Sequence, residues 1–466
     1  MRRLPELLLV VVAVGASAVA LWLYVHDAAP SATSAPAPKV RAAPSGAADR
    51  GTPPPTNLPL AAAESLSAIF EAEQIADPMQ RCMAYPTPSG YHWPQAMNAA
   101  RCADLVAPAL GWDQFTKAID GGKAGEIDAH LDALVADYFA KRAPEGALQD
   151  AYGHNFWNSS ETLKRSIDQW HAQAPASAHA FTARGMYWVA TAQQARGEDT
   201  IGNTPAQNLA DMRKSLDLAQ RDLEKAISIN PRIMPAYSAL IDVARLSGKR
   251  DLAERTIRQA TQIDPATFFP RAYLSDMYEP RWGGSFEAMD RLAADAMPLA
   301  DQNPRLIDLK VTALAARGLP FHWAHDYASA LREFEKGLAE GPDKFYLDLA
   351  QYAAGKANDN VRAVELLSQI VRFSPKDIAA RRTRAYYLAR LGRDDWATSD
   401  LDVVLRTNPH DAQALHGYAT TLIHKNDNEG ARAKLDEALA ADPADQWAKE
   451  TLAWMHSTGR IAAPAP

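Results

Sequence analysis

The chain has almost no cysteine, no excess of basic residues and no recognisable catalytic motif. Its 466 residues include only two cysteines, Cys82 and Cys102, which excludes a multi-zinc fold and a disulfide-dense fold. The net charge is −7, and because residues 1–59 carry five bases against three acids, the rest of the chain carries −9. Phosphate binding needs a basic surface, so no nucleic acid is expected as a partner.

Motifs for common enzymatic chemistry are also absent from the sequence. It contains no Gly-x-Ser-x-Gly nucleophile elbow, no His-Glu-x-x-His zinc helix, no phosphate-binding glycine loop and no dinucleotide-binding fingerprint. His322-x-x-His325 followed by Asp326 could place two imidazoles and a carboxylate together, but no further strong ligand is specified nearby. Surface histidines are the favoured interpretation, with a metal site as the alternative. We expect no catalytic residue, no metal and no cofactor.

Only one long apolar run occurs, and it lies at the N-terminus. The uncharged segment Leu7–Val25 would span about 29 Å as a helix, close to the roughly 30 Å of a bilayer core. Arg2 and Arg3 precede it, which predicts a cytoplasmic N-terminus and export of everything that follows. Residues 1–26 are therefore interpreted as a single-pass inner-membrane anchor, with the body in the periplasm. The alternative is a signal peptide cleaved near Ala18, which would leave a soluble periplasmic protein.

Residues 27–59 are rich in alanine, proline, serine and threonine and contain almost no large apolar side chain. Such a segment cannot bury enough surface to offset the entropy of ordering, so it is predicted to be a disordered linker. A plain spacer is the favoured interpretation, and a proline-rich ligand for a partner is the alternative.

Residues 60–175 are predicted to form an N-terminal helical region. Cys82 and Cys102 flank an irregular loop, and a disulfide is expected after export, with free thiols or a metal site as alternatives. The run from Tyr152 to Trp157 contains a glycine and adjacent aromatic residues and is interpreted as a turn between helices. An apolar stripe that steps by three and four residues indicates a helix, and it consists of Ile127, Leu131, Leu134, Val135 and Tyr138.

The rest of the chain carries prolines at a nearly fixed period. The interval between successive prolines is about 34 residues, with two longer intervals in the middle of the series, and each proline is expected to follow the end of a helix. A period of about 34 residues with a terminal proline is typical of tetratricopeptide repeats (TPRs), in which two antiparallel helices form each unit. The predicted fold is therefore all-α, a right-handed superhelix of TPR-type antiparallel helix pairs. The prolines are Pro231, Pro265, Pro304, Pro342, Pro375, Pro409 and Pro443.

The side chains within the repeats agree with this interpretation. Small residues such as Ala419 and Ala431 recur where the two helices of a pair must approach closely, and large apolar residues recur where they fill the groove between the helices. Arg381 occupies one of the apolar positions and fits imperfectly. Helical repeats are assigned to residues 176–300, and further TPRs to residues 301–460.

The stretch from about Trp170 to Ser285 resembles the domain of unknown function 4034, a bacterial family that is usually fused to TPRs. The resemblance implies helical repeats and an envelope location, but it implies no reaction. Its most specific element is the segment Pro280–Ser285. The other matching residues are Trp170, Pro175, Ser177, Arg196, Gly197, Asp222, Leu223, Asn230 and Pro231.

The candidate site is a loop formed by Arg281, Trp282, Gly283, Gly284 and Ser285. If the loop is a structural turn, its glycines adopt positive φ, Trp282 fills a repeat interface and Ser285 caps the next helix. If it is a pocket, the glycine amides, the serine hydroxyl and the guanidinium converge on an anion or a carboxylate. The turn is the favoured interpretation.

Two functions of different classes are compatible with these features. The favoured hypothesis is a non-enzymatic envelope scaffold that binds a protein or peptide partner through the concave surface of its TPR solenoid. The alternative is a hydrolase or transferase with a site near Arg281 to Ser285, in which the repeats recruit the substrate.

Overall fold

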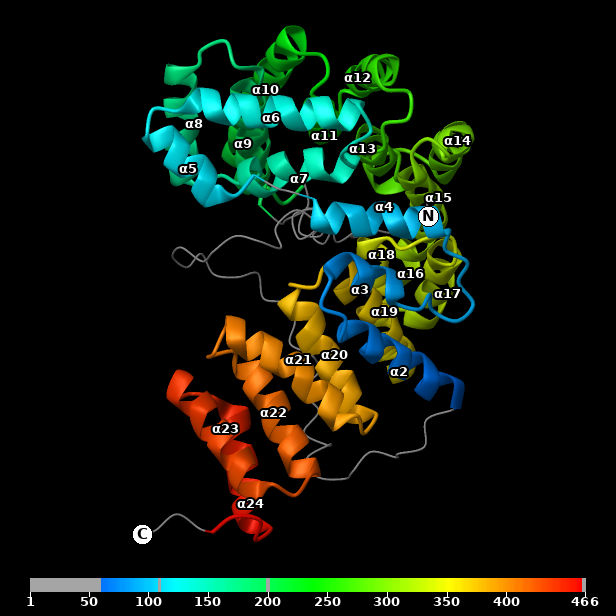
Figure 1. The fold of residues 1–466 in the computed structure, drawn as a ribbon, viewed down its shortest axis with the longest axis vertical. Coiled ribbons are helices and arrows are strands. Elements are labelled where there is room, and N and C mark those ends of the chain that lie inside the picture. Colours follow the sequence, from blue (N-terminus) through cyan, green and yellow to red (C-terminus); the bar gives the residue numbers. More distant parts are fainter. Residues whose placement is uncertain (1–59, 108–109, 198–201, 463–466) are drawn as a thin grey trace, which may run out of the picture. The chain divides into compact units, whose positions relative to one another are not determined.

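The structure, a computed structural model, describes residues 60–107, 110–197 and 202–462 (Figure 1). All regular elements in these ranges are α-helices or short 3-10 helices, as the sequence predicts. The expected anchor at residues 1–26 and the linker at 27–59 lie outside the described residues. Among the helices that are described, none is both long and apolar enough to cross a bilayer.

The chain divides into two compact units. Unit 1 contains Val106–Arg317, and unit 2 contains residues 60–105 together with Gly318–Pro466. This division differs from the predicted one at residues 175 and 300. The reason is that α2 (Leu60–Glu73) and α3 (Pro78–Ala84) pack against α19 (Asn360–Phe373) of the C-terminal repeats.

Unit 1 consists of four helices followed by antiparallel helix pairs. The first such pair, α9 and α10, lies directly ahead of Pro231. The helices of unit 1 are α5 (Trp112–Asp120), α6 (Ala124–Phe139), α7 (Glu145–Phe156), α8 (Glu161–Gln173), α9 (Ala178–Arg196), α10 (Ala206–Ile229), α11 (Met234–Ser247), α12 (Arg250–Ile263), α13 (Phe269–Met277), η1 (Pro280–Trp282), α14 (Phe286–Ala296), η2 (Met297–Leu299), η3 (Pro304–Leu306) and α15 (Ile307–Ala315).

Unit 2 combines three N-terminal helices with the C-terminal repeats, and η4 (Ala316–Gly318) lies at its boundary with unit 1. Its helices are α2 (Leu60–Glu73), α3 (Pro78–Ala84), α4 (Gln95–Val106), α16 (Leu319–Trp323), α17 (Tyr327–Leu338), α18 (Lys344–Lys356), α19 (Asn360–Phe373), α20 (Ile378–Arg390), α21 (Asp394–Thr407), α22 (Ala412–His424), α23 (Asn428–Ala441) and α24 (Gln446–Ser457).

Each C-terminal repeat begins with the same helix cap. Asp377, Asp411 and Asp445 recur once per repeat, and each carboxylate accepts a hydrogen bond of 2.9 to 3.0 Å from the backbone amide three residues later. A side-chain oxygen at this position satisfies a backbone donor that the helix itself leaves unpaired. The period read from the prolines is therefore also the period of the helix N-termini.

The small residues of the repeats lie where the sequence places them. Ala419 of α22 and Ala431 of α23 have no exposed surface, so the two helices of this pair approach closely. Arg381, which fits an apolar position poorly, is also buried, and its guanidinium lies 2.9 Å from Asp400 and 3.4 Å from Glu73. At this position of the repeat, the buried Arg381 pairs with acidic side chains where an apolar residue was expected.

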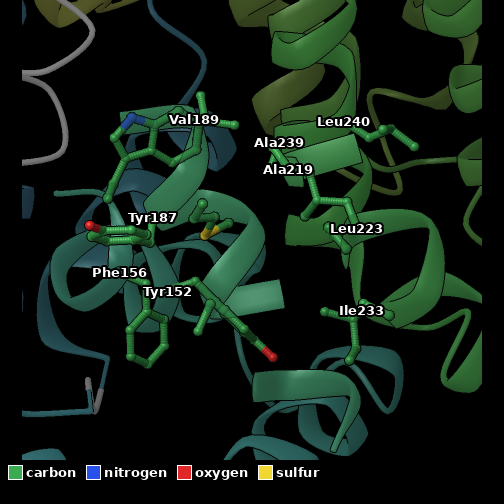
Figure 2. Close-up of a cluster of buried hydrophobic side chains, with 14 of the residues drawn as sticks. Tyr152, Phe156, Tyr187, Val189, Ala219, Leu223, Ile233, Ala239 and Leu240 are labelled. Atoms are coloured by element: carbon green, nitrogen blue, oxygen red, sulfur yellow. The ribbon is translucent and has the colours of Figure 1, made fainter. Parts of the chain in front are cut away.

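The apolar core of unit 1 includes side chains of α7, which packs against α9 and α11, the first helices of two successive pairs (Figure 2). Tyr152 and Phe156 of α7 have no exposed surface, and both belong to the helix rather than to a turn. The interpretation of residues 152–157 as a turn was therefore wrong. The helix continues because its aromatic side chains bury against neighbouring helices, and it ends at Phe156.

The start of α7 is fixed by a buried carboxylate. Glu145 accepts hydrogen bonds from the Thr267 hydroxyl at 2.7 Å, from the Phe268 amide at 2.8 Å and from the Phe269 amide at 3.1 Å. The Asn303 side chain donates a further bond of 2.7 Å. Burial raises the pKa of Glu145, while these donors act in the opposite direction. One acidic side chain thereby joins α7 to the start of α13 and to η3.

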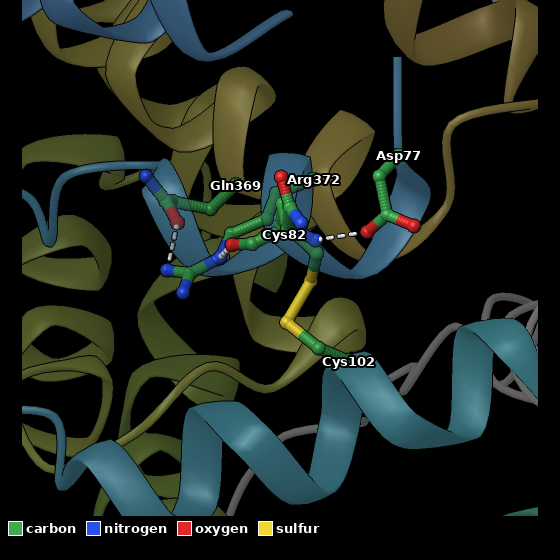
Figure 3. Close-up of a disulfide and its surroundings, with 6 residues drawn as sticks. Asp77, Cys82, Cys102, Gln369 and Arg372 are labelled. Carbon is green, nitrogen blue, oxygen red and sulfur yellow. Dashed lines mark hydrogen bonds between the residues drawn. A yellow bond between two sulfur atoms is a disulfide. The ribbon is translucent and has the colours of Figure 1, made fainter. Parts of the chain in front are cut away.

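Cys82 and Cys102 form the disulfide that the sequence predicts (Figure 3). It joins α3 to α4, and both cysteines are buried. Beside it, the Arg372 guanidinium of α19 donates a 2.7 Å hydrogen bond to the Cys82 carbonyl. Gln369 donates to the carbonyl of Pro86 at 3.0 Å. One face of α19 therefore holds the disulfide-linked segment through its backbone.

A buried ion cluster makes the second connection between this segment and the repeats. Arg384 of α20 has no exposed side-chain surface and lies 2.6 Å from Glu73 of α2 and 2.7 Å from Asp400 of α21. The Tyr85 hydroxyl donates a 2.8 Å hydrogen bond to Glu73. Although burial opposes ionisation, Arg384 and Arg381 hold the pKa of Glu73 below its usual value. Removing one member would leave a buried charge uncompensated.

The disulfide should stabilise unit 2 rather than unit 1. Cys82→Ser should lower the melting temperature of unit 2, because the chain-entropy model assigns about 3 kcal/mol to a loop of this length. Calorimetry of the full chain with and without reductant provides the measurement. The difference between variant and wild type should vanish under reducing conditions, and a shift confined to unit 1 would contradict the placement of residues 60–105.

Candidate functional site

The predicted loop lies between α13 and α14 and is a tight turn. Gly283 has φ of +78°, a conformation that favours glycine, and a side chain on Gly284 would overlap the backbone of Tyr278. The Ser285 hydroxyl accepts a 3.2 Å hydrogen bond from the amide of Ala288 and so caps α14. Both glycines and the serine are therefore explained by the path of the backbone.

The Arg281 guanidinium is occupied by a carboxylate of the same turn. Its Nε lies 2.6 Å from Oε2 of Glu279, and its Nη2 donates a 2.9 Å hydrogen bond to Oε1. Only 3% of the Glu279 side chain is exposed, so the pair is almost completely removed from solvent. The guanidinium is thus held by Glu279 and does not converge with the Ser285 hydroxyl on a shared anion site.

Trp282 is half-buried and does not fill the repeat interface alone. The Arg245 guanidinium of α11 lies 4.5 Å from the centre of its ring, a cation–π contact. Arg245 is in turn bound to Asp242, with its Nη2 2.5 Å from a carboxylate oxygen, and Gln193 donates a 3.2 Å hydrogen bond to Asp242. The predicted turn is therefore one side of a charged cluster that extends to α11 and α9.

Asp276 of α13 belongs to the same cluster. Burial and the neighbouring charge of Glu279 raise its pKa to about 7, against the opposing effect of Arg245 and Arg281. Asp242 contributes further negative charge. The cluster contains three acids and two arginines, so one carboxylate lacks a matching guanidinium.

Asp242, Arg245 and Asp276 were not predicted from the sequence. The sequence could have indicated them by position, because these charged residues stand on the faces of α11 and α13 that the repeat pattern requires to be buried. A single buried charge costs several kcal/mol unless it is paired. Such positions in a helical repeat therefore point to partners on neighbouring helices, but the partners themselves are visible only in the fold.

The histidine motif of the sequence does not assemble a ligand set. Asp326 caps α17 by accepting a hydrogen bond from the Ser329 amide, and His325 Nδ1 lies 2.7 Å from the Tyr327 hydroxyl. His322 lies among aromatic rings, and burial together with His325 lowers its pKa. Across the described ranges, no group of three or more His, Cys, Asp or Glu side chains is arranged to hold a metal ion.

The rings around His322 belong to a surface that the sequence did not single out. Tyr352 of α18 is 36% exposed, and its ring centre lies 5.8 Å from that of His322 and 5.5 Å from that of Tyr327. The Tyr387 hydroxyl of α20 lies against Gly355 of α18. The ring centres of Tyr387 and its neighbour Tyr386 are 5.1 Å apart. We call this surface the aromatic strip, and it consists of His322, His325, Tyr327, Tyr352, Tyr386 and Tyr387.

The charged cluster of unit 1 should be tested by removing one partner at a time. Arg281→Ala should destabilise unit 1 by about 2 to 4 kcal/mol, because it leaves Glu279 buried without its partner. Ser285→Ala should cost only about 1 kcal/mol, the value of a lost helix cap. Urea unfolding measures both. A fully stable Arg281→Ala protein that has lost partner binding would instead support the pocket interpretation.

Asp276 should make unit 1 less stable as the pH rises. Since its pKa is raised to about 7 in the folded state, the folded chain keeps a proton between about pH 4 and pH 7 that the unfolded chain loses, so stability falls through this window. Asp276→Asn should remove that fall, so that the change in stability from pH 5 to pH 8 is about 2 to 3 kcal/mol more favourable in the variant than in wild type. Urea titrations at both pH values provide the test, and parallel pH profiles would contradict it.

Residues 116–252 match the family model of the domain of unknown function DUF4034. The match covers less than a third of the chain, lies within unit 1 and extends from α5 to the start of α12. It differs from the predicted stretch of residues 170–285 at both ends, and the loop Pro280–Ser285 lies outside it. The resemblance to this family is therefore carried by the first helices of unit 1 and not by the tryptophan loop.

Similar proteins are remote in sequence. Cellulose synthase 2 operon protein C of Komagataeibacter xylinus is 25% identical over 290 residues, which cover 61% of this chain but only 20% of that protein. The crystal structure of YrrB, a TPR protein with an unusual peptide-binding site, is 21% identical and covers 42% of this chain and 97% of its own, with a TM-score of 0.31. A TPR protein from Parabacteroides merdae is 16% identical, covers 52% of this chain and 92% of its own, and has a TM-score of 0.25. The TPR character of this chain rests on its own proline period and helix pairs, and its DUF4034 likeness on residues 116–252.

Proposed function

We propose that the chain is a non-enzymatic scaffold that binds a protein or peptide partner through unit 2. The observation that carries this proposal is the aromatic strip. Large aromatic side chains are costly to expose, and on protein surfaces they are enriched at the centres of binding interfaces. Tyr352 is 36% exposed, and Phe321, which precedes His322, is 41% exposed.

Unit 1 offers a different surface on the corresponding helices. Its helix α11 is buried at every residue from Met234 to Arg245, since α7, α9, α10, α12 and α13 all pack against it. In unit 2, α18 and α20 are the first helices of two repeat pairs. They carry part of the aromatic strip and leave it partly open to solvent. This contrast supports unit 2 as the partner-binding part and unit 1 as its structural companion.

We also propose a location and an overall geometry. Residues 1–26 anchor the chain in the inner membrane, and residues 27–59 act as a spacer that places the repeats in the periplasm. Within unit 2, the helix pairs follow a right-handed superhelix whose concave surface receives the partner. These statements are supported by the apolar N-terminal run, the paired arginines before it and the period of the prolines.

Site-specific photo-crosslinking in intact cells tests partner binding. A photoreactive phenylalanine analogue in place of Tyr352 should yield a covalent adduct with a specific protein, because the side chain projects into the proposed interface. The same analogue in place of Lys449, an exposed residue of α24, is the control and should give none. Absence of any adduct at Tyr352, Tyr386 and His325 would contradict the proposed function.

A further inference from the structure

We infer that the Cys82–Cys102 disulfide is a redox-active site, which a dithiol reductant opens by attack on Cys102 while Cys82 leaves as a thiolate beside the Arg372 guanidinium. The inference goes beyond the proposed function and does not depend on it, because it concerns α3, α4 and α19 and not the aromatic strip. It rests on a buried arginine without an acidic partner and on the different attachment of the two cysteines to the repeats.

The Arg372 side chain lies beside the disulfide (Figure 3). Only 3% of this residue is exposed, and its guanidinium donates hydrogen bonds to the Cys82 carbonyl at 2.7 Å and to the side-chain oxygen of Gln369 at 3.2 Å. Both acceptors are uncharged. Burial lowers the pKa of Arg372 to about 10, and only Tyr85 acts in the opposite direction. The guanidinium is therefore a cation at neutral pH, and no carboxylate of the described residues compensates it.

Arg384, the other buried arginine that contacts the segment 60–105, has the partners that Arg372 lacks. It pairs with Glu73 and Asp400, and these acids raise its pKa although burial opposes ionisation. A buried charge without a counterion is destabilising. A thiolate on Cys82 would supply the negative charge that is missing at Arg372, whereas the intact disulfide supplies none.

The other charges on the two cysteine-bearing helices balance one another. Asp77 caps α3 and Arg81 lies within it, while α4 carries Arg101 and Asp104. Each helix with its cap thus contributes one charge of each sign. Arg372 is consequently the charge in excess near the disulfide, and its carbonyl contact is with Cys82 and not with Cys102.

The two cysteines are attached to the repeats to different degrees. Cys82 lies on α3, which packs against α19 and is held there through its backbone by Arg372. Cys102 lies on α4, which packs less extensively against any described helix. Both cysteines are buried, so exchange requires a local opening. Opening of α4 exposes the Cys102 sulfur while Cys82 stays on α19.

The exchange passes through a mixed disulfide. A thiolate of the reductant attacks Sγ of Cys102 and forms a new sulfur–sulfur bond, while the bond between the two cysteines breaks and its electron pair remains on Cys82. The second thiol of the reductant loses its proton to solvent and attacks its own sulfur in the mixed disulfide, and Cys102 leaves and takes up a proton. The reductant is oxidised by two electrons, and the cysteine pair gains them. A stabilised thiolate leaves faster, so Arg372 selects Cys82 as the leaving group.

Trapping with glutathione in the full chain identifies the sulfur that is attacked. The oxidised native protein is incubated with glutathione, the freed thiol is blocked with N-ethylmaleimide, and mass spectrometry locates the adduct. Glutathione should be found on Cys102 in at least about tenfold excess over Cys82. An adduct mainly on Cys82 would overturn the inference.

Reduction kinetics with dithiothreitol separate an electrostatic from a structural role of Arg372. Arg372→Leu should slow reduction of the native full chain by about tenfold, because the leaving thiolate loses its counterion. A purely structural role predicts the reverse, since a loosened segment would expose the disulfide and speed its reduction. Arg372→Lys keeps the charge and should react within about threefold of wild type.

The matched control removes one positive charge from an exposed position close to α19. Lys376→Leu should leave the reduction rate within about twofold of wild type, because surface charges are largely screened. Thermal melting of the oxidised proteins shows whether each variant is folded. Should Arg372→Leu not fold, Arg372→Lys and the glutathione adduct of the wild type still decide the matter.

Hydrogen exchange follows the consequence of reduction. The amides of α4 should lose protection in the reduced full chain, while those of α3 and α19 stay protected, because Arg372 still holds the Cys82 backbone. The inference is wrong if the disulfide is reduced only at temperatures at which unit 2 melts, or if folded Arg372→Leu is reduced as fast as wild type. Simultaneous opening of α3 and α4 on reduction would contradict it as well.

Discussion

A guanidinium without solvent contact links residues 60–105 to the C-terminal repeats. Arg384 bonds Glu73 of the N-terminal segment and Asp400 of its own repeat, and the Ser368 hydroxyl accepts a third bond at 3.1 Å. A charge removed from water is tolerated only when its partners are complete. The pairing therefore ties α2 to α20 and α21, because losing Glu73 would leave the buried guanidinium short of a partner.

The disulfide and the face of α19 complete this attachment. Ser65, Pro86 and Cys82 are all hydrogen-bonded by side chains of α19, at residues 365, 369 and 372. These three positions lie on one helix face, which in an isolated repeat would be exposed to water. The segment thus covers α19, the second helix of its pair, and the repeats provide the short segment with buried surface.

Both units bury charged side chains between their helices. Unit 1 pairs Asp242 with Arg245 inside, and Asp276 stands beside this pair. Unit 2 buries Arg384 and Asp400 between its helices and uses the buried carboxylates of Asp377, Asp411 and Asp445 as helix caps. In both units the buried charges therefore fix the packing of neighbouring helices.

The sequence by itself determined the repeat and the disulfide. The spacing of the prolines and of small residues such as Ala419 indicates helix pairs, and the two cysteines lie close enough in sequence to pair across one loop. The sequence also left two roles for Ser285, a helix cap or part of a pocket. It favoured the structural turn, and in the structure Ser285 caps α14. Three features were decided only by tertiary structure. Residues 60–105 dock on repeats some 300 positions away in sequence, the partners of Arg384 include Glu73, and the rings of α16, α17, α18 and α20 meet in one strip. Each depends on contacts between segments that are distant in sequence, and no local periodicity records such contacts because a helix pattern specifies which face is buried but not which helix buries it.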